Sequence, residues 1–260
     1  MERILVTDTS FGDLEIEREI LDELDCEVVE ASGDLEDSVR DADYVLTHRR
    51  PITAPVIQAM ERAKVIVRYG SSLDSIDCAA AKEANLAVCN VPDYAIEELA
   101  DHTLALILSL ARQVDPNARR ARAGDHGLAV RPSTIRTLAE LTVGLVGWGF
   151  VGRAVTERLR PFSCRVLVAD PAVSFEEIEA AGAGAVELPY LFAESDVISL
   201  HCPGNEANHQ LIDEDALFQT KIGVRLVNTS HGRLIDSAAT YKRQKLQLAY
   251  KSCHQQQQLH

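Results

Sequence analysis

The sequence lacks an apolar run long enough to cross a membrane. Its best run, Leu104–Ala111, falls far short of the roughly 18–20 residues that a bilayer requires. The N-terminal residues MERILVTDTSFGDLE also lack the basic and then apolar pattern of a signal peptide. Together these absences predict a cytoplasmic protein that does not act at a membrane.

Basic residues are scarce. The 260 residues include 26 Lys and Arg against 40 Asp and Glu, which gives a formal net charge of −14. A surface this acidic repels both the phosphate backbone of nucleic acids and anionic lipid headgroups. We therefore expect neither a nucleic acid nor a membrane surface as a partner.

Paired cysteine motifs are also missing. None of the six cysteines forms a C-x-x-C pair, and the histidines have no partner at the spacing of zinc ligands. We interpret the cysteines as reduced thiols rather than a disulfide framework, and we expect no metal site.

Strand and helix patterns alternate along most of the chain. Short β-branched runs separated by helical patterns of about ten residues predict an α/β fold with a parallel sheet. A second series of this kind starts at Leu141. Its expected strands are Thr142–Val146, Arg165–Ala169, Val186–Leu188, Asp196–Leu200 and Val224–Asn228.

A long helical pattern, Ile96–Val114, separates the two series and marks the domain boundary. The basic stretch 117–136 that follows it has few apolar residues and is expected to be a loop. The composition changes again near the end. Residues 241–260 contain four basic residues, no acidic residue and a Gln run, which predicts a divergent tail without a strand, of a composition compatible with disorder.

A glycine-rich turn is the most informative motif. Gly147, Gly149 and Gly152 form the pattern G-x-G-x-x-G after the apolar run TVGLV, and Asp170 ends the next expected strand. In this context the glycines permit a tight turn, the approach of backbone N–H groups to a pyrophosphate, and close packing of helix on strand. A carboxylate at 170 suits the ribose hydroxyls and repels a 2′-phosphate, so the motif predicts NAD rather than NADP.

Two further polar turns follow expected strands. The segment 228–236 has the sequence NTSHGRLID at the carboxyl end of a strand, where doubly wound sheets bind ligands. The segment 68–74, RYGSSLD, offers small residues and backbone N–H groups to a carboxylate or a phosphate. From the spacing alone, an ordinary turn without a ligand is an equally good interpretation of each segment.

The order of these motifs resembles that of the NAD-dependent D-2-hydroxyacid dehydrogenases, a family that includes phosphoglycerate dehydrogenase and the C-terminal-binding-protein corepressors. The resemblance runs from about residue 3 to about residue 240. It rests on YGSSLDSID (69–77), NVPDYAIEELADHTLAL (90–106), GLVGWGFVGRAV (144–155), Asp170-Pro171, SDVISLHCPGNEANHQLI (195–212) and LVNTSHGRLID (226–236).

The resemblance implies a flavodoxin-like substrate domain at residues 1–96 and a Rossmann-type, doubly wound NAD-binding domain at residues 97–240, the latter without its last strands. It also implies an active site between the two domains and a homodimer formed through the NAD-binding domain. The reaction would be hydride transfer between NAD(H) and a 2-hydroxy or 2-keto acid.

Matched motif by motif, the resemblance also assigns residues to the site. The residues implied on the cofactor side are Gly147, Gly149, Phe150, Val151, Gly152 and Asp170, with Cys202 by the adenine and Thr229, Ser230 and His231 by the nicotinamide. Ser71 would meet the cofactor or the substrate, and Gly70 and Ser72 would offer backbone N–H groups to the substrate carboxylate.

The sequence departs from the family pattern at its catalytic positions. His231 stands where the family has an Arg that binds the substrate carboxylate, and Arg233 lies two residues further on. An imidazole lacks the planar fork of a guanidinium. The family's catalytic Glu and His have no counterpart, because residues 237–260 contain no Glu and His254 has different surroundings. Ser72 replaces a family glycine.

These departures leave several functions open. The chain is expected to be an NAD-dependent oxidoreductase with an incomplete active site. The alternatives are a catalytically inactive NAD-binding module that acts as a sensor or scaffold, and a truncated gene product without function. We hypothesise a truncation or frameshift near residue 240, which would leave Val224–Asn228 as an exposed edge strand.

Overall fold

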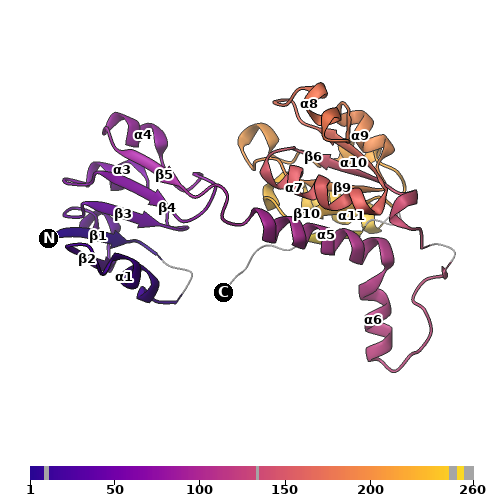
Figure 1. The fold of residues 1–260 in the computed structure, drawn as a ribbon, viewed down its shortest axis with the longest axis horizontal. Coiled ribbons are helices and arrows are strands. Elements are labelled where there is room, and N and C mark those ends of the chain that lie inside the picture. The colour runs from indigo at the N-terminus through magenta and orange to yellow at the C-terminus, as the bar shows by residue number, and fades with distance from the viewer. Residues whose placement is uncertain (9–11, 133–134, 246–250, 255–260) are drawn as a thin grey trace. The chain divides into compact units, whose positions relative to one another are not determined.

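Runs of β-branched and aliphatic residues form two parallel sheets in the computed structural model (Figure 1). The structure describes residues 1–8, 12–132, 135–245 and 251–254. The chain divides into a first unit, Met1–Tyr94, and a second unit that begins at Ala95. Each unit is described by itself below.

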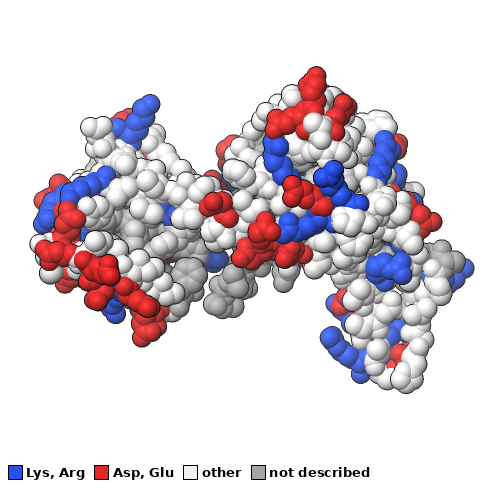
Figure 2. Space-filling view, in the orientation of Figure 1, with Lys and Arg blue, Asp and Glu red and all other residues white. Residues whose placement is uncertain are grey.

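In the first unit the strands follow the order β2-β1-β3-β4-β5. The elements in chain order are β1 (Glu2–Val6), α1 (Glu15–Leu21), β2 (Cys26–Glu30), α2 (Leu35–Ser38), β3 (Tyr44–Thr47), α3 (Ala54–Gln58), β4 (Val65–Arg68), α4 (Cys78–Glu83) and β5 (Ala87–Asn90). Leu5, Val45 and Ile66 from the strands form a core with α2, α3 and α4. Helix α1 buries none of its residues, and acidic side chains gather over it (Figure 2).

In the second unit the strands follow the order β11-β10-β9-β6-β7-β8. Its strands are β6 (Thr142–Val146), β7 (Arg165–Ala169), β8 (Gly184–Ala185), β9 (Val197–Leu200), β10 (Arg225–Asn228) and β11 (Lys251–His254). Its helices are α5 (Ile96–Arg112), α6 (Val114–Arg122), α7 (Phe150–Leu159), α8 (Phe175–Ala180), α9 (Leu188–Glu194), α10 (Glu214–Gln219) and α11 (Ser237–Lys245). Short 3-10 turns lie at Leu138–Glu140, Arg160–Phe162, Glu206–Asn208 and Gly232–Leu234.

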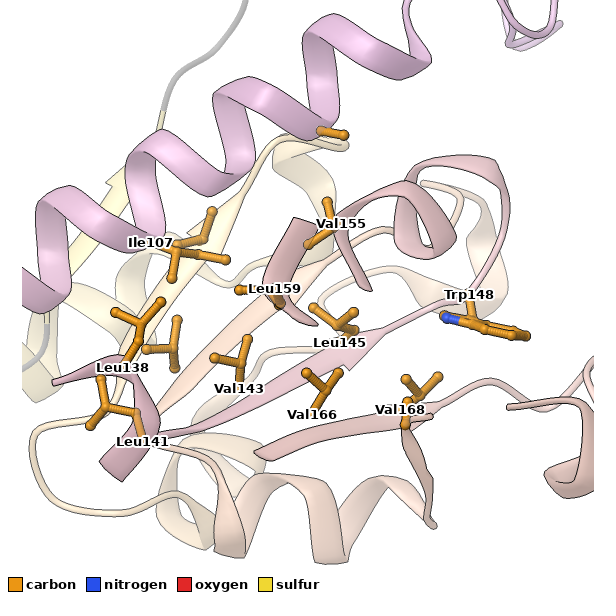
Figure 3. Packing of buried hydrophobic residues seen from close by; sticks show 14 of the residues in the cluster. Ile107, Leu138, Leu141, Val143, Leu145, Trp148, Val155, Leu159, Val166 and Val168 are labelled. Carbon is orange, nitrogen blue, oxygen red and sulfur yellow. The ribbon is translucent and has the colours of Figure 1, made fainter. Parts of the chain in front are cut away.

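The second unit has two clusters of buried hydrophobic residues, one of which lies between β6 and the pair α5 and α7. Ile107 of α5, Leu145 of β6 and Val155 of α7 are fully buried and belong to one cluster (Figure 3). All five residues of β6 are buried, as expected for a central parallel strand that is covered on both faces. Trp148 is only 2% exposed and joins the same cluster. This packing fixes the turn that follows β6.

The expected loop at 117–136 is wrong for residues 117–122, which are helical, and the expected strand at Val186–Leu188 is wrong. Helix α6 extends to Arg122, with Asp115 in its first turn and arginines in its last, charges that suit the helix dipole. Leu188 begins α9 rather than ending a strand, because Pro189 in the first turn of that helix fits a helix start. The strand in this region is β8, two residues earlier in the chain.

The end of the chain also differs from the expectation. Helix α11 extends to Lys245, and β11 pairs in parallel with β10, Arg225 opposite Lys251 and Asn228 opposite His254. Strand β10 is therefore an interior strand, and the expected exposed edge at this position is wrong. The sequence KSCH of β11 has no β-branched or aromatic residue to indicate a strand, whereas ladder pairing needs only backbone N–H and C=O groups.

Candidate functional site

Three loops meet where the strand order of the second unit reverses. The chain runs from β6 outward to β7 and β8, and then returns to β9 on the other side of β6. In doubly wound sheets the crevice for a ligand opens at this point, outside the carboxyl ends of the strands. The loops that follow β6, β9 and β10 all lie at that end.

Gly147 allows the loop after β9 to approach the turn after β6. Its φ is +95°, and a Cβ at this position would lie 2.7 Å from the backbone N of Cys202. Because backbone atoms cannot rotate away, only glycine fits here. The approach brings Cys202 next to the glycine turn.

Gly149 and Gly152 have opposite surroundings. A Cβ on Gly152 would lie 2.5 Å from the backbone O of Gly147, so α7 packs directly on its own turn. A Cβ on Gly149 would meet no atom within 4 Å. Gly149 therefore borders open space in front of the N-terminus of α7, and we call this space the cradle. The first turn of α7 contains no acidic residue. Backbone N–H groups and a helix dipole at such a position suit the phosphates of a dinucleotide.

Asp170 follows β7 and is held against the same turn. One carboxylate oxygen, Oδ2, accepts a hydrogen bond of 2.7 Å from the backbone N of Trp148, and Oδ1 accepts one of 2.8 Å from the backbone N of Ala172. Each oxygen of a carboxylate can accept more than one hydrogen bond. Asp170 thus keeps acceptor capacity for ribose hydroxyls, and the residues present fit a bound dinucleotide.

The loop after β9 supplies uncharged groups. Burial lowers the pKa of His201 to about 4, so its imidazole is neutral near pH 7, and Nε2 lies 2.9 Å from the Ser199 hydroxyl. Burial raises the pKa of the Cys202 thiol to about 11, and the charge of Asp170 contributes to the rise. Cys202 therefore remains a thiol rather than a nucleophilic thiolate. The sequence-predicted Cys202 and Asp170 are brought close together.

The loop after β10 is tied to both its own strand and the β9 loop. The Asn228 side chain donates to the backbone O of His231, and the Ser230 hydroxyl donates to the backbone O of Cys202 at 2.8 Å. A Cβ on Gly204 would lie 2.5 Å from Cβ of His231, so this histidine packs directly on the β9 loop. The loops that carry Ser230, His231 and Cys202 are therefore in contact.

Sequence reasoning missed two contacts in this region. The hydroxyl of Thr103, in the middle of α5, lies 2.8 Å from the hydroxyl of Thr229. Arg233 forms an ion pair of 2.7 Å with Glu206. No motif marks either contact, because Thr103 occupies an ordinary core position of an apolar helix and Glu206 lies in a turn. The predicted residues Phe150 and Val151 lie in the first turn of α7, with Phe150 exposed.

The predicted residues of the first unit form a separate group. Gly70 has a φ of +135°, and the guanidinium of Arg68 covers it so closely that a Cβ would overlap with Nη1. The Asn90 side chain donates to the backbone O of Ser71 at 2.7 Å, and the Ser72 hydroxyl accepts from the backbone N of Asp74. Gly70, Ser71 and Ser72 thus lie in a hydrogen-bonded turn after the carboxyl end of β4.

Neither a metal centre nor a membrane-spanning helix is found in the described ranges. Within them, no cluster of three or more His, Cys, Asp or Glu side chains could hold a metal ion. The helices of the same ranges include none with the length and apolar character needed to span a membrane.

Comparison with known proteins identifies relatives. Residues 104–249 match the family model described as D-isomer specific 2-hydroxyacid dehydrogenase, NAD binding domain. The chain is 38% identical to the D-lactate dehydrogenase of Escherichia coli (strain K12) over 195 residues, 74% of this chain and 58% of the relative. It is 34% identical to the D-3-phosphoglycerate dehydrogenase of Mycobacterium bovis over 203 residues, 78% of this chain and 38% of the relative.

Solved structures share the fold. The crystal structure of the D-lactate dehydrogenase of Aquifex aeolicus, complexed with NAD and lactic acid, matches with a TM-score of 0.84 and 28% identity. The match covers 94% of this chain and 73% of that chain. The chain spans less than two thirds of the length of the two curated relatives, at 58% and 38%.

Proposed function

The chain belongs to the D-isomer-specific 2-hydroxyacid dehydrogenase family, and from this premise we propose that it binds NAD(H) at the glycine turn after β6 and exchanges a hydride between NAD(H) and a small 2-hydroxy or 2-keto acid. NAD is the cofactor of the family's matching domain. The observation that carries the proposal is the open cradle at Gly149 beside the carboxylate of Asp170.

Each side of the cradle has a role in the proposal. The backbone N–H groups at the start of α7, from Phe150 and Val151, receive the phosphates, and Asp170 accepts hydrogen bonds from the adenosine ribose. Cys202 contacts the adenine side as a neutral, largely buried thiol. Thr229 and Ser230 contact the nicotinamide side.

The acid substrate is received by different groups. When bound, NAD⁺ would accept the hydride and NADH would donate it. In the proposal, the backbone N–H groups of the turn at Ser71 and Ser72 receive a carboxylate in the first unit. His231, in the second unit, stands where the family has its carboxylate-binding Arg. Arg233 lies two residues beyond the family position, and its guanidinium pairs with Glu206 at the surface.

A second candidate function is NAD binding without turnover. One observation favours it: His231 stands where the family has an Arg that binds the substrate carboxylate, and an imidazole lacks the planar fork of a guanidinium.

Oxidation of NADH in the presence of pyruvate, glyoxylate, hydroxypyruvate or phenylpyruvate separates the two candidates. Turnover of one of these acids, reduced at least about tenfold in a His231→Ala variant, supports hydride exchange. NADH binding without turnover of any of these acids supports the second candidate, NAD binding without catalysis. Absence of NADH binding contradicts both.

NADH is expected to bind more tightly than NADPH, and replacement of Asp170 by Asn should reduce the ratio of the two dissociation constants at least about tenfold. This change corresponds to ~1.4 kcal/mol of binding free energy. The reason is that the amide loses the charge that repels the 2′-phosphate but keeps an oxygen acceptor. Titrations that follow quenching of Trp148, the only tryptophan, measure both affinities.

Asp213→Asn is the matched control for this titration, because Asp213 caps α10 and accepts from the backbone N of Ala216. It should leave the cofactor preference unchanged. An equal preference in the native chain and in Asp170→Asn would contradict the assignment of Asp170.

A further inference from the structure

A chain of two hydroxyl groups connects helix α5 to the loop after β10. The Thr103 side chain is fully buried. Its Oγ1 lies 2.7 Å from the backbone O of Leu99, one turn earlier in α5, and 2.8 Å from Oγ1 of Thr229. Thr229 is partly exposed at the carboxyl end of β10. One side of this chain of hydroxyls therefore ends on a carbonyl and the other faces the candidate site.

The single proton of each hydroxyl sets the direction of the chain. A carbonyl oxygen only accepts, so the contact between Thr103 and Leu99 is a hydrogen bond only when Thr103 donates. Thr103 then has no proton left for Thr229, and Thr229 must donate to Thr103. The reverse order would leave two oxygen atoms 2.7 Å apart with no proton between them, at a position with no exposed surface.

We propose that Thr103 is a positioning residue, which fixes the Thr229 hydroxyl as a hydrogen-bond acceptor toward the site and thereby selects a donor group on the bound ligand. Once its proton points to Thr103, Thr229 offers only lone pairs to a ligand. The inference rests on the proposed NAD function, in which Thr229 contacts the nicotinamide side. The matching donor there is the amino group of the nicotinamide carboxamide.

Selection for a donor can be measured by binding alone. Nicotinic acid adenine dinucleotide carries a carboxylate where NAD carries the carboxamide, so a fixed acceptor disfavours it. ADP-ribose lacks the nicotinamide ring, so its affinity reports on the rest of the proposed dinucleotide site. In Thr103→Val the acceptor for the Thr229 proton is gone, and the Thr229 hydroxyl becomes free to donate to a carboxylate.

The experiment measures the affinities of the full chain and its variants for these three ligands by calorimetry. The native chain is expected to bind NAD at least about tenfold more tightly than nicotinic acid adenine dinucleotide. The carboxamide N–H can donate to the fixed acceptor, whereas a carboxylate oxygen finds no donor there, and an unpaired charged group costs more than an unpaired neutral one. Thr103→Val should reduce this preference at least about fivefold while the affinity for ADP-ribose stays within about twofold. Thr103→Ser keeps the hydroxyl and should retain the native preference.

Thr240→Val is the matched control, since the buried Thr240 makes the same hydroxyl bond to the carbonyl four residues earlier, that of Asp236, on α11. It should keep the native preference. Thr103→Ala serves as a second variant without the hydroxyl, should the valine variant fail to fold.

The outcomes separate this inference from the proposed function. An unchanged preference in Thr103→Val or Thr103→Ala, with ADP-ribose still bound, overturns the role of Thr103 alone. Failure of the folded native chain to bind either ADP-ribose or NAD overturns the proposed function and this inference with it. An equal loss of ADP-ribose affinity in Thr103→Val and Thr103→Ser also overturns it, because that result indicates a merely structural role.

Discussion

Gly149→Ala is expected to weaken NADH binding at least about a hundredfold while the second unit keeps its fold. The added methyl group points into the open cradle, where it meets no protein atom within 4 Å and so causes no clash. A ligand phosphate that contacts the backbone N–H groups of this turn needs the same space. Gly149 is the N-cap of α7, and alanine is a poor residue there, which costs about 1 kcal/mol of unfolding free energy.

Titration with NADH and denaturation with urea measure the two effects on one sample. Gly184→Ala is the matched control, because it adds a methyl group at β8, where a Cβ would lie 3.1 Å from the Leu167 side chain and away from the glycine turn. It should bind NADH as the native chain does. If Gly149→Ala binds NADH with native affinity, the cradle is not the dinucleotide site.

Gly152→Ala is expected to lower the unfolding free energy of the second unit by about 2 kcal/mol and to abolish NADH binding. Its Cβ would lie 2.5 Å from the backbone O of Gly147, and two backbone segments must separate to admit it. Overpacking of this kind costs up to about 3 kcal/mol. The better helix propensity of alanine returns about 1 kcal/mol, so the steric cost dominates.

Urea denaturation followed by Trp148 fluorescence measures this change in the second unit, because Trp148 is the only tryptophan and lies in that unit. Gly149→Ala provides the comparison, since it adds the same methyl group three residues earlier into open space. Equal midpoints for the two variants would show that α7 does not pack on its turn as described.

Much of the fold was predictable because its determinants are local. β6 is rich in valine and leucine and fully buried, and Gly147, Gly149 and Gly152 have a spacing that one turn and one helix start require. Asp170 was predictable for the same reason, since it directly follows a buried strand. These features depend on backbone conformation and burial within a few residues, which the sequence records directly.

Other features were not predictable from local patterns. Helix α6 is built from polar residues that resemble a loop in composition, and β11 has no strand propensity of its own, so its pairing with β10 depends on backbone groups far away in the sequence. The sequence singled out His231 by its position in the motif. It did not predict that the His231 side chain packs directly on Gly204, where a Cβ would lie 2.5 Å from the Cβ of His231.

The sequence by itself therefore determined an α/β chain with a G-x-G-x-x-G turn after β6 and an acidic residue, Asp170, directly after the next strand. Only the tertiary structure decided that β10 is an interior strand, that Arg233 is engaged by Glu206, and that Thr103 meets Thr229 across 126 positions of sequence. The physical reason is that turn geometry and hydrophobic periodicity are local, whereas hydrogen-bond direction and ion pairing depend on which distant groups the folded chain brings together.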